Sequence, residues 1–172
     1  PRACARGGRS SCAAMRQSKA FVKKKRSGAV VKVVREHYLR DDIWCGSPLA
    51  APEHRGPGGT PTPLSGAQGA LYTVVDGGVA LQQLDLLERP EVTDVVVLGS
   101  VLEEVRGRNA AAHGRLRALC AAPGKRFFVF SNEHHREAYC AAEPGEPPGA
   151  RAARAVARAA AWYKGACPGA RV

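Results

Sequence analysis

LYTVVDGGVALQQLDLLERP, residues 71–90, opens with a short β-branched run, passes an acid and two glycines, and continues with apolar residues at helical spacing. VVVLGSVLEEVRGRN, residues 95–109, repeats this arrangement with a second acid on the helix that follows the run. Strands that alternate with helices favour a parallel sheet with helices on its faces. The sequence therefore predicts an α/β fold built from strand–helix units.

The same reasoning assigns the other elements between residues 71 and 164. The expected strands are 71–75, 93–98 and 126–130, and the expected helices are 79–88, 100–105, 110–121, 132–142 and 151–164. Ser100 and Glu103 have capping-box spacing, and Asn132 is a typical N-cap residue, so these residues are expected to begin their helices.

Two acids stand where such a fold binds ligands. Asp76 directly follows the first strand, and Glu104 lies on the helix after the second. The carboxyl ends of parallel strands meet at one edge of a sheet, which is the usual ligand site of open α/β folds. Carboxylate oxygens are the ligands that Mg²⁺ and Mn²⁺ prefer, so the two acids predict a divalent-metal site.

The charge of the chain points to a polyanionic partner. Twenty-six basic against fifteen acidic residues give a net charge of +11, which favours RNA, although part of the charge lies in the first segment. The basic run 19–26 has three interpretations: phosphate contact, nuclear import, or a solvated strand edge protected by lysines. Under the first, the RNA-binding residues are Lys23, Lys24, Lys25 and Arg26.

The remaining composition narrows the class of protein. No apolar run approaches the roughly 20 residues that span a bilayer, so no membrane partner is expected. The six cysteines form no CxxC pair and favour a reducing compartment. Met15 is the only methionine, and residues 1–14 are therefore expected to be an extension outside the fold.

REHYLRDD (35–42) and NEHHREAY (132–139) complete a pattern with the two strand–helix units. Together they resemble the N-terminal PIN domain of the catalytic ribonuclease subunit of the eukaryotic RNA exosome, over roughly Ser18 to Lys164. The resemblance implies a three-layer fold with a central parallel sheet flanked by helices. It also implies a metal-dependent endoribonuclease acting in RNA degradation and rRNA processing, with exosome core subunits as partners and a nuclear, in part cytoplasmic, location.

The resemblance also implies a domain organisation. Residues 15–45 form a basic exosome-docking segment, whose docking arginine and glutamate are expected at positions 36 and 37. Residues 46–70 form a Gly/Pro-rich loop, residues 71–164 the PIN-like domain and residues 165–172 a tail. The family's final acid lies on a strand beyond the Trp-Tyr helix, and this strand is expected to be missing because the chain ends at Val172.

Several positions depart from the family's acidic site. Ala150 and Ala153 stand where the family has aspartates, and Gly77 and Gly78 replace the Thr and Asn that follow its first acid. With two of four carboxylates lost, Mg²⁺ or Mn²⁺ should bind weakly, and the expected site is a degenerate nuclease site. The arginines on the same helix remain, and two of them are expected to bind RNA: Arg151 and Arg154.

The family's three-cysteine docking motif is also incomplete. Cys45 matches its first cysteine, but Ala50 and Glu53 replace the others. A structural zinc needs about four ligands. Cys45 and His54 supply two, and His37 would have to reach them from a strand, so zinc is not expected.

Two alternatives stay open beside the degenerate-site hypothesis. One is an active Mn²⁺-dependent endoribonuclease that recruits Asp85 or Glu103 as substitute acids. The other is a module that binds proteins only, with its basic charge serving the exosome surface. Salt-dependent binding of a short single-stranded RNA distinguishes the second alternative from the other hypotheses.

Overall fold

The computed structural model describes residues 14–56, 58, 62–147 and 149–172, without the side chains of 14–21 and 35–37. A central sheet has the strand order β3–β4–β5, and all its strands are parallel. Its strands are β3 (Thr73–Val75), β4 (Val95–Leu98) and β5 (Phe127–Phe130). All three lie within or overlap the predicted strands.

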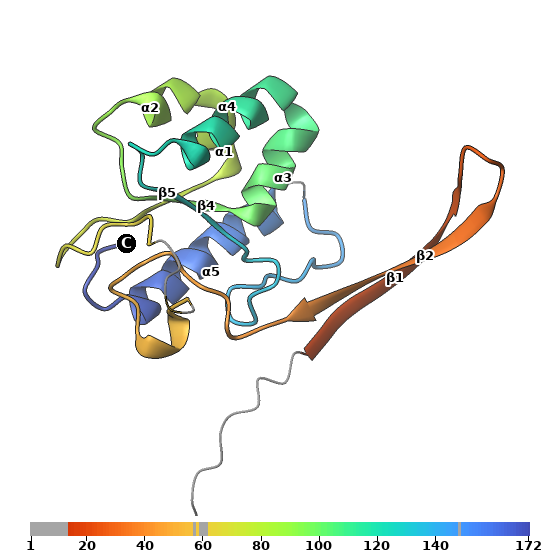
Figure 1. Cartoon of the computed structure of the whole chain (residues 1–172), viewed down its shortest axis with the longest axis horizontal. Coiled ribbons are helices and arrows are strands. Elements are labelled where there is room, and N and C mark those ends of the chain that lie inside the picture. Colours follow the sequence, from red (N-terminus) through yellow and green to blue (C-terminus); the bar gives the residue numbers. More distant parts are fainter. Residues whose placement is uncertain (1–13, 57, 59–61, 148) are drawn as a thin grey trace, which may run out of the picture.

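Helices cover both faces of this sheet (Figure 1). On one face lie α1 (Gly77–Gln82), α2 (Leu84–Glu88), α3 (Gly99–Arg108) and α4 (Ala110–Ala121), and on the other lies α5 (Ala150–Ala166). The predicted three-layer α/β fold, a parallel sheet flanked by helices, is confirmed. No helix in the described part of the chain has the length and apolar character needed to cross a membrane.

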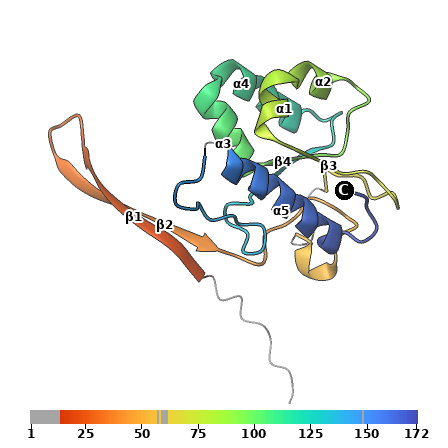
Figure 2. The same ribbon diagram turned by 180° about the vertical axis from the view of Figure 1, so that it is seen from behind.

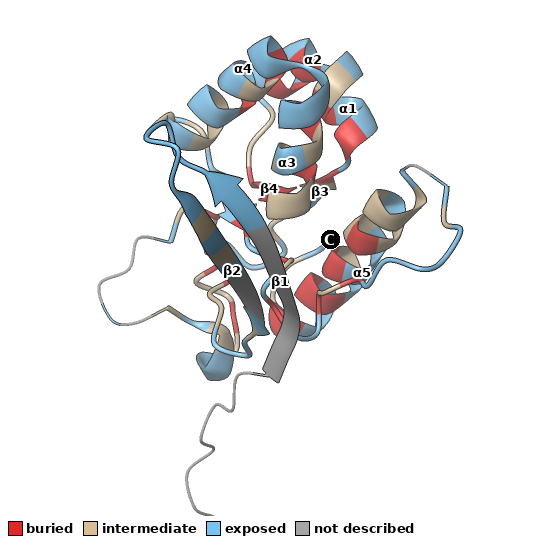
Figure 3. Ribbon diagram, turned by 90° about the vertical axis from the view of Figure 1, so that its right-hand side faces the viewer, coloured by how far each residue is buried: buried red, intermediate tan, exposed pale blue. Residues whose placement is uncertain are grey.

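The core lies between these layers, and β4 is at its centre. Every residue from Val95 to Leu98 is fully buried, because this strand has a strand on each side and helices on both faces. Buried residues also mark the sheet-facing sides of α3 and α5 (Figure 3). The uninterrupted apolar run in the sequence is thus the mark of a central parallel strand.

The helix expected over 79–88 is two helices. The Asp76 side chain accepts a hydrogen bond from the Val79 backbone N–H at 2.7 Å, so α1 begins at Gly77, earlier than predicted. Gln83 leaves the helical region of backbone space with φ −125° and ψ 31°, and α2 starts directly after it.

The expected capping box at Ser100 is wrong, and so is the helix expected over 132–142. Ser100 lies inside the first turn of α3, where its backbone N–H donates to Asn132 Oδ1 at 3.2 Å. Asn132 Nδ2 donates in turn to Ser100 Oγ at 3.0 Å. Asn132 therefore caps a helix 32 residues away instead of beginning its own. Turns occupy residues 132–134 and 136–138, and His135 between them forms a bridge with Arg40.

A β-hairpin projects from the three-layer body (Figures 1 and 2). Its antiparallel strands are β1 (Ala14–Lys24) and β2 (Val30–Leu39), and Gly28 takes the left-handed conformation in the turn, with φ +82°. Val22 and Val30 are 68% and 67% exposed, and the described hairpin side chains include no buried one. The hairpin is an arm that contributes little to the core.

The chain joins the core earlier than expected, near residue 40. Arg40 exchanges backbone hydrogen bonds with the turn segment at His134 and Arg136. Cys45 is fully buried, and its carbonyl accepts a hydrogen bond from the Tyr163 hydroxyl at 2.8 Å. The boundary of the separable arm therefore lies before Arg40, not at residue 45.

The segments expected to be loop and tail also belong to the core. Leu64 and Cys167 are buried, and the Tyr72 backbone N–H donates to the Arg171 carbonyl at 2.7 Å. Leu71 and Arg171 form a parallel bridge, which brings the end of the chain beside β3. The described residues of 46–70, together with residues 165–172, therefore cover the side of the sheet next to β3.

Asp94 links segment 46–70 to the sheet, and a variant at this position tests how much that link stabilises the fold. It is buried, has a left-handed φ of 58°, accepts from the Ser65 N–H at 2.7 Å and pairs with Arg126 at 2.8 Å. Burial alone would raise the pKa of Asp94, but the hydrogen bonds from Arg126 and Ser65 outweigh it and hold the pKa below its ordinary value.

Asp94→Ala should therefore lower the free energy of unfolding by about 2–4 kcal/mol at pH 7. Asp94→Asn is the control, since Asn tolerates the left-handed backbone and removes only the charge. The folded-state pKa is depressed, so the advantage of Asp over Asn is present above about pH 4. This advantage should vanish as the pH falls through the lower folded-state pKa. Urea denaturation at pH 7 and pH 3 measures it, and an Asn variant as stable as the parent at pH 7 would contradict it.

Candidate active site

Asp76 lies at the carboxyl end of β3, as its position in the sequence predicts. The strand ends at Val75, and the Asp76 side chain is exposed at the start of α1. One carboxylate oxygen already accepts the Val79 N–H. Asp76 thus serves as a helix cap at the edge of the sheet where the metal site was expected.

Glu104 reaches the same edge from α3. A Cβ atom at Gly77 would lie 2.5 Å from Glu104 Oε2, so the carboxylate rests against the residue next to Asp76. Glu104 Oε2 is buried without a hydrogen-bond partner, while Oε1 lies 3.4 Å from Arg108 Nη1. The structure thus places the Glu104 carboxylate against Gly77, the residue after Asp76, with Arg108 beside it.

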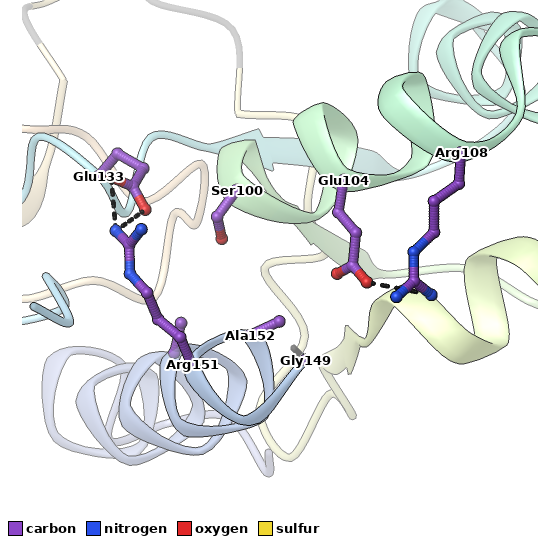
Figure 4. Close-up of a pocket in the computed structure, with 8 residues that line it drawn as sticks. Ser100, Glu104, Arg108, Glu133, Gly149, Arg151 and Ala152 are labelled. Atoms are coloured by element: carbon purple, nitrogen blue, oxygen red, sulfur yellow. Dashed lines mark hydrogen bonds and ion pairs between the residues drawn. The ribbon is translucent and has the colours of Figure 1, made fainter. Parts of the chain in front are cut away.

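A pocket of about 280 Å³ opens between α3 and the first turns of α5 (Figure 4). Its lining comes from both helices and from the turn after β5: Ser100, Glu104, Arg108, Glu133, Gly149, Arg151, Ala152 and Ala155. Sequence reasoning missed Ser100 and Arg108, which lie at the two ends of α3, and Glu133, which lies in the turn after β5. The sequence shows that Arg108 and Glu133 are charged, but it does not show which charged residues form ion pairs in the fold.

Each carboxylate of the pocket has an arginine beside it. Arg151 Nη2 donates to Glu133 Oε1 at 2.8 Å, and Arg108 faces Glu104 (Figure 4). Among the described residues, no group of three or more His, Cys, Asp or Glu side chains is arranged to hold a metal ion. A site with this composition attracts anions at least as well as cations.

The alanines expected to replace the family's aspartates, Ala150 and Ala153, do not line this pocket. Ala153 is exposed and Ala150 is half-buried, while the pocket is lined by Ala152 and Ala155 of the same helix. Figure 4 shows Ala152 between Arg151 and Gly149, on the side of α5 that faces Glu104. An acid placed at Ala152 would therefore face the pocket most directly.

The two arginines predicted to bind RNA form ion pairs and hydrogen bonds within the fold. Arg151 donates to the Cys140 carbonyl at 3.0 Å as well as to Glu133. Arg154 donates to Glu146 at 2.8 Å and pairs with Glu143 at 2.7 Å. Both side chains fasten the segment before α5 to that helix, so neither is a free cation for RNA.

The lysines of the hairpin are placed differently. Lys23, Lys24, Lys25 and Arg26 are all exposed and occupy the end of β1 and the turn of the arm. They lie on the part of the chain that projects farthest from the three-layer body (Figure 1). These four cations are therefore accessible to a partner.

The expected positions of the docking pair are wrong by one residue. Position 36 is Glu36, and position 37 is His37 and not a glutamate. The arginine and glutamate of the REHYLRDD segment are therefore Arg35 and Glu36. All three residues lie on β2, and their side chains are outside the described part of the structure, so their part in docking stays a prediction.

The residues considered for zinc do not converge in the described part of the chain. Cys45 lies beside Cys167, with 3.9 Å between the sulfur atoms. His54 instead packs edge-on against Trp162, with 5.2 Å between the ring centroids. At the other two positions of the three-cysteine motif the chain offers no thiol, since one is a buried alanine and the other is the exposed Glu53.

The acids considered as substitutes have partners of their own. Asp85 pairs with Arg115 at 2.5 Å, and Glu103 pairs with Arg106 at 2.5 Å. Neither lines the pocket beside Glu104. This placement weakens the hypothesis of an active site rebuilt from neighbouring acids.

Comparisons with known proteins add an independent line of evidence, although no family model matches the chain. The human exosome complex exonuclease RRP44 is 46% identical over 156 residues, which cover 87% of this chain and 16% of that protein. The Arabidopsis thaliana RRP44 homolog A is 42% identical over 87% of this chain, and Schizosaccharomyces pombe dis3 is 32% identical over 86%.

The fold comparison agrees with the sequence comparison. The T. brucei RRP44 PIN domain superposes with a TM-score of 0.63 at 28% identity, covering 73% of this chain and 66% of that one. The chain spans about one sixth of the length of the curated relatives that it matches, because the matched part is 15–16% of each.

Proposed function

We propose that this chain, a homologue of the exosome exonuclease RRP44 with the fold of the RRP44 PIN domain, is the PIN-domain part of an exosome ribonuclease subunit. In this role it contacts RNA and exosome core subunits in the nucleus, in RNA processing and degradation. Its own endonuclease activity is weak or lost. The homology supports the first part of this proposal, and the composition of the pocket supports the last.

The pocket does not fit a divalent cation. Mg²⁺ and Mn²⁺ need several hard anionic oxygens, often with water completing the shell. Here Asp76 caps α1, and Glu104 and Glu133 each face an arginine. The third side of the pocket offers the methyl groups of Ala152 and Ala155. This arrangement is the observation that carries the degenerate-site proposal.

RNA contact is assigned to the tip of the hairpin. Lys23, Lys24, Lys25 and Arg26 project into solvent on an arm whose described side chains include no buried one. A cluster of exposed cations with no carboxylate among its four residues suits a phosphate backbone. The exposed valines of the same arm, Val22 and Val30, suit contact with a protein surface.

The experiment that tests RNA contact is the triple variant Lys23→Ala, Lys24→Ala and Lys25→Ala. Its affinity for a labelled single-stranded RNA should fall by about tenfold or more at 0.1 M salt, because each phosphate contact releases a counterion. The slope of log K against log salt should become shallower by about 2 for three lost contacts. Fluorescence anisotropy over a salt series measures both quantities.

A matched control removes the same charge elsewhere. Arg89, Arg106 and Arg117 are exposed on the helical layer, away from the hairpin, and their triple alanine variant has the same net charge. It should lose much less affinity. Equal losses in both triple variants would show that the hairpin tip has no special part in RNA binding, and no binding by the parent would favour the protein-only alternative.

A further inference from the structure

Two buried thiols from opposite ends of the body meet beside the sheet. Cys45 lies in the segment that leads from the hairpin into the core, and Cys167 follows the last turn of α5. Both residues are fully buried, and their sulfur atoms are 3.9 Å apart although 122 residues separate them in the sequence. This distance is that of two thiols in van der Waals contact.

Hydrogen bonds fix the backbone on both sides of the pair. The Tyr163 hydroxyl donates to the Cys45 carbonyl at 2.8 Å, and the Cys167 N–H donates to the Tyr163 carbonyl at 2.9 Å. The Ala51 N–H donates to the Ala166 carbonyl at 2.9 Å. One tyrosine thus holds both cysteine segments, and the meeting of the thiols is a property of the fold.

We propose that Cys45 and Cys167 form a site of reversible oxidation, at which hydrogen peroxide converts the two thiols to an intramolecular disulfide. A disulfide needs sulfur atoms about 2.05 Å apart, so they must approach by about 2 Å. This inference goes beyond the proposed role in RNA metabolism and does not depend on it.

The oxidation proceeds in two balanced steps. The Cys167 thiolate attacks one peroxide oxygen, so an S–O bond forms, the O–O bond breaks and hydroxide leaves. The Cys45 sulfur then attacks the sulfenic sulfur, so the S–S bond forms and the S–O bond breaks. The Cys45 proton leaves with that oxygen as water. The proton that Cys167 released on forming its thiolate neutralises the hydroxide. Two thiols therefore lose two electrons in total, and one peroxide becomes two waters.

The surroundings of the two thiols favour Cys167 as the thiol that attacks peroxide first. A side-chain hydrogen bond with Cys45 lowers the pKa of Cys167, although burial opposes it, and a further hydrogen bond comes from Ser47. The same pairing, together with burial, raises the pKa of Cys45. These directions favour attack on peroxide by Cys167 and resolution by Cys45, across the 3.9 Å contact between their sulfur atoms. By contrast, burial raises the pKa of Cys120 to about 11, which makes this thiol a poor competitor.

The bond would join the root of the hairpin arm to the end of α5. Closure of a loop longer than 100 residues restricts the unfolded chain strongly. The melting temperature should therefore rise by about 5–15 °C on oxidation and return on reduction. In the oxidised chain the segment that connects the hairpin to the core would be linked covalently to the end of α5.

Peptide mapping of the full chain tests the proposal. The folded chain is treated with hydrogen peroxide, free thiols are alkylated, and trypsin then releases DDIWCGSPLAAPEHR (41–55) and GACPGAR (165–171). The expected product is these two peptides joined, two hydrogens lighter than their sum, and separated again by dithiothreitol. Chain oxidised in guanidinium should instead give mixed pairings among all six cysteines.

Variants complete the test. Cys45→Ser and Cys167→Ser should each abolish the rise in melting temperature, whereas Cys120→Ser and Cys140→Ser should keep it. Mapping of the parent chain does not depend on whether any variant folds. The proposal is overturned if folded, peroxide-treated chain yields peptides 41–55 and 165–171 only as separate alkylated or oxidised species.

Discussion

Removal of residues 1–38 should leave the melting temperature of the remaining chain within about 3 °C of the parent, whereas removal of residues 1–47 should lower it by more than about 10 °C. The shorter deletion takes away the hairpin, whose described side chains are exposed or half-buried. The longer deletion also takes away Trp44 and Cys45. Trp44 packs edge-on against Phe128 with 5.0 Å between the ring centroids, and Cys45 is fully buried.

The longer deletion also removes hydrogen-bond partners of two buried tyrosines. The Tyr163 hydroxyl loses the Cys45 carbonyl that accepts it. The Tyr72 hydroxyl loses the Ser47 hydroxyl at 2.6 Å and keeps only the Ser65 carbonyl. An unpaired buried polar group costs about 1–3 kcal/mol, and the lost aromatic and thiol packing adds to this. Differential scanning calorimetry of the two truncated chains measures the difference. Equal melting temperatures would show that the core begins after residue 47.

The boundary between the hairpin arm and the core is a feature that sequence reasoning placed wrongly. The boundary of the arm was expected at residue 45 because the Gly/Pro-rich stretch begins there. Gly and Pro mark irregular backbone, but irregular backbone can still be buried. Gly46, with φ +76°, lets the chain pass so close to Phe128 that a Cβ there would lie 2.5 Å from the ring. That contact depends on a residue 82 positions away, which no local pattern reports.

Regular elements were predictable because they depend on residues close together in the sequence. The strand at 95–98 and the helix at 110–121 follow from short-range patterns, and Asn109 caps the helix through its own next residues, Ala111 and Ala112. Asn132 has the same chemistry but caps a helix across the fold. Local spacing cannot distinguish these two outcomes.

In the candidate site too, features set by strand topology were predictable, and features set by distances between helices were not. The topology of parallel strands was enough to bring Asp76 and Glu104 to one edge. The pairing of Arg151 with Glu133 and of Arg108 with Glu104 was not foreseen, since it depends on the distance between α5 and its neighbours. Sequence reasoning thus predicted the edge of the sheet at which Asp76 and Glu104 lie, while only the structure shows the arginines beside Glu104 and Glu133.

The purified chain should show little RNA cleavage in Mn²⁺, and one restored carboxylate should change its metal binding most. Ala152→Asp places an acid on the pocket wall that faces Glu104, and Mn²⁺ affinity should rise by about tenfold or more because affinity follows the number of anionic ligands. The family-matched pair Ala150→Asp with Ala153→Asp should have a smaller effect, since Ala153 is exposed and does not line the pocket.

Ala152→Asn is the matched control, because it adds the same bulk without the charge and should leave Mn²⁺ affinity near that of the parent. Titration calorimetry with Mn²⁺ and cleavage of a labelled single-stranded RNA give separate readouts of binding and turnover. Turnover needs more than one bound ion in a good geometry, and Arg108 and Arg151 still oppose it, so cleavage should lag behind binding in every variant. Brisk Mn²⁺-dependent cleavage by the unmodified chain, abolished by Asp76→Asn, would instead establish an active endoribonuclease.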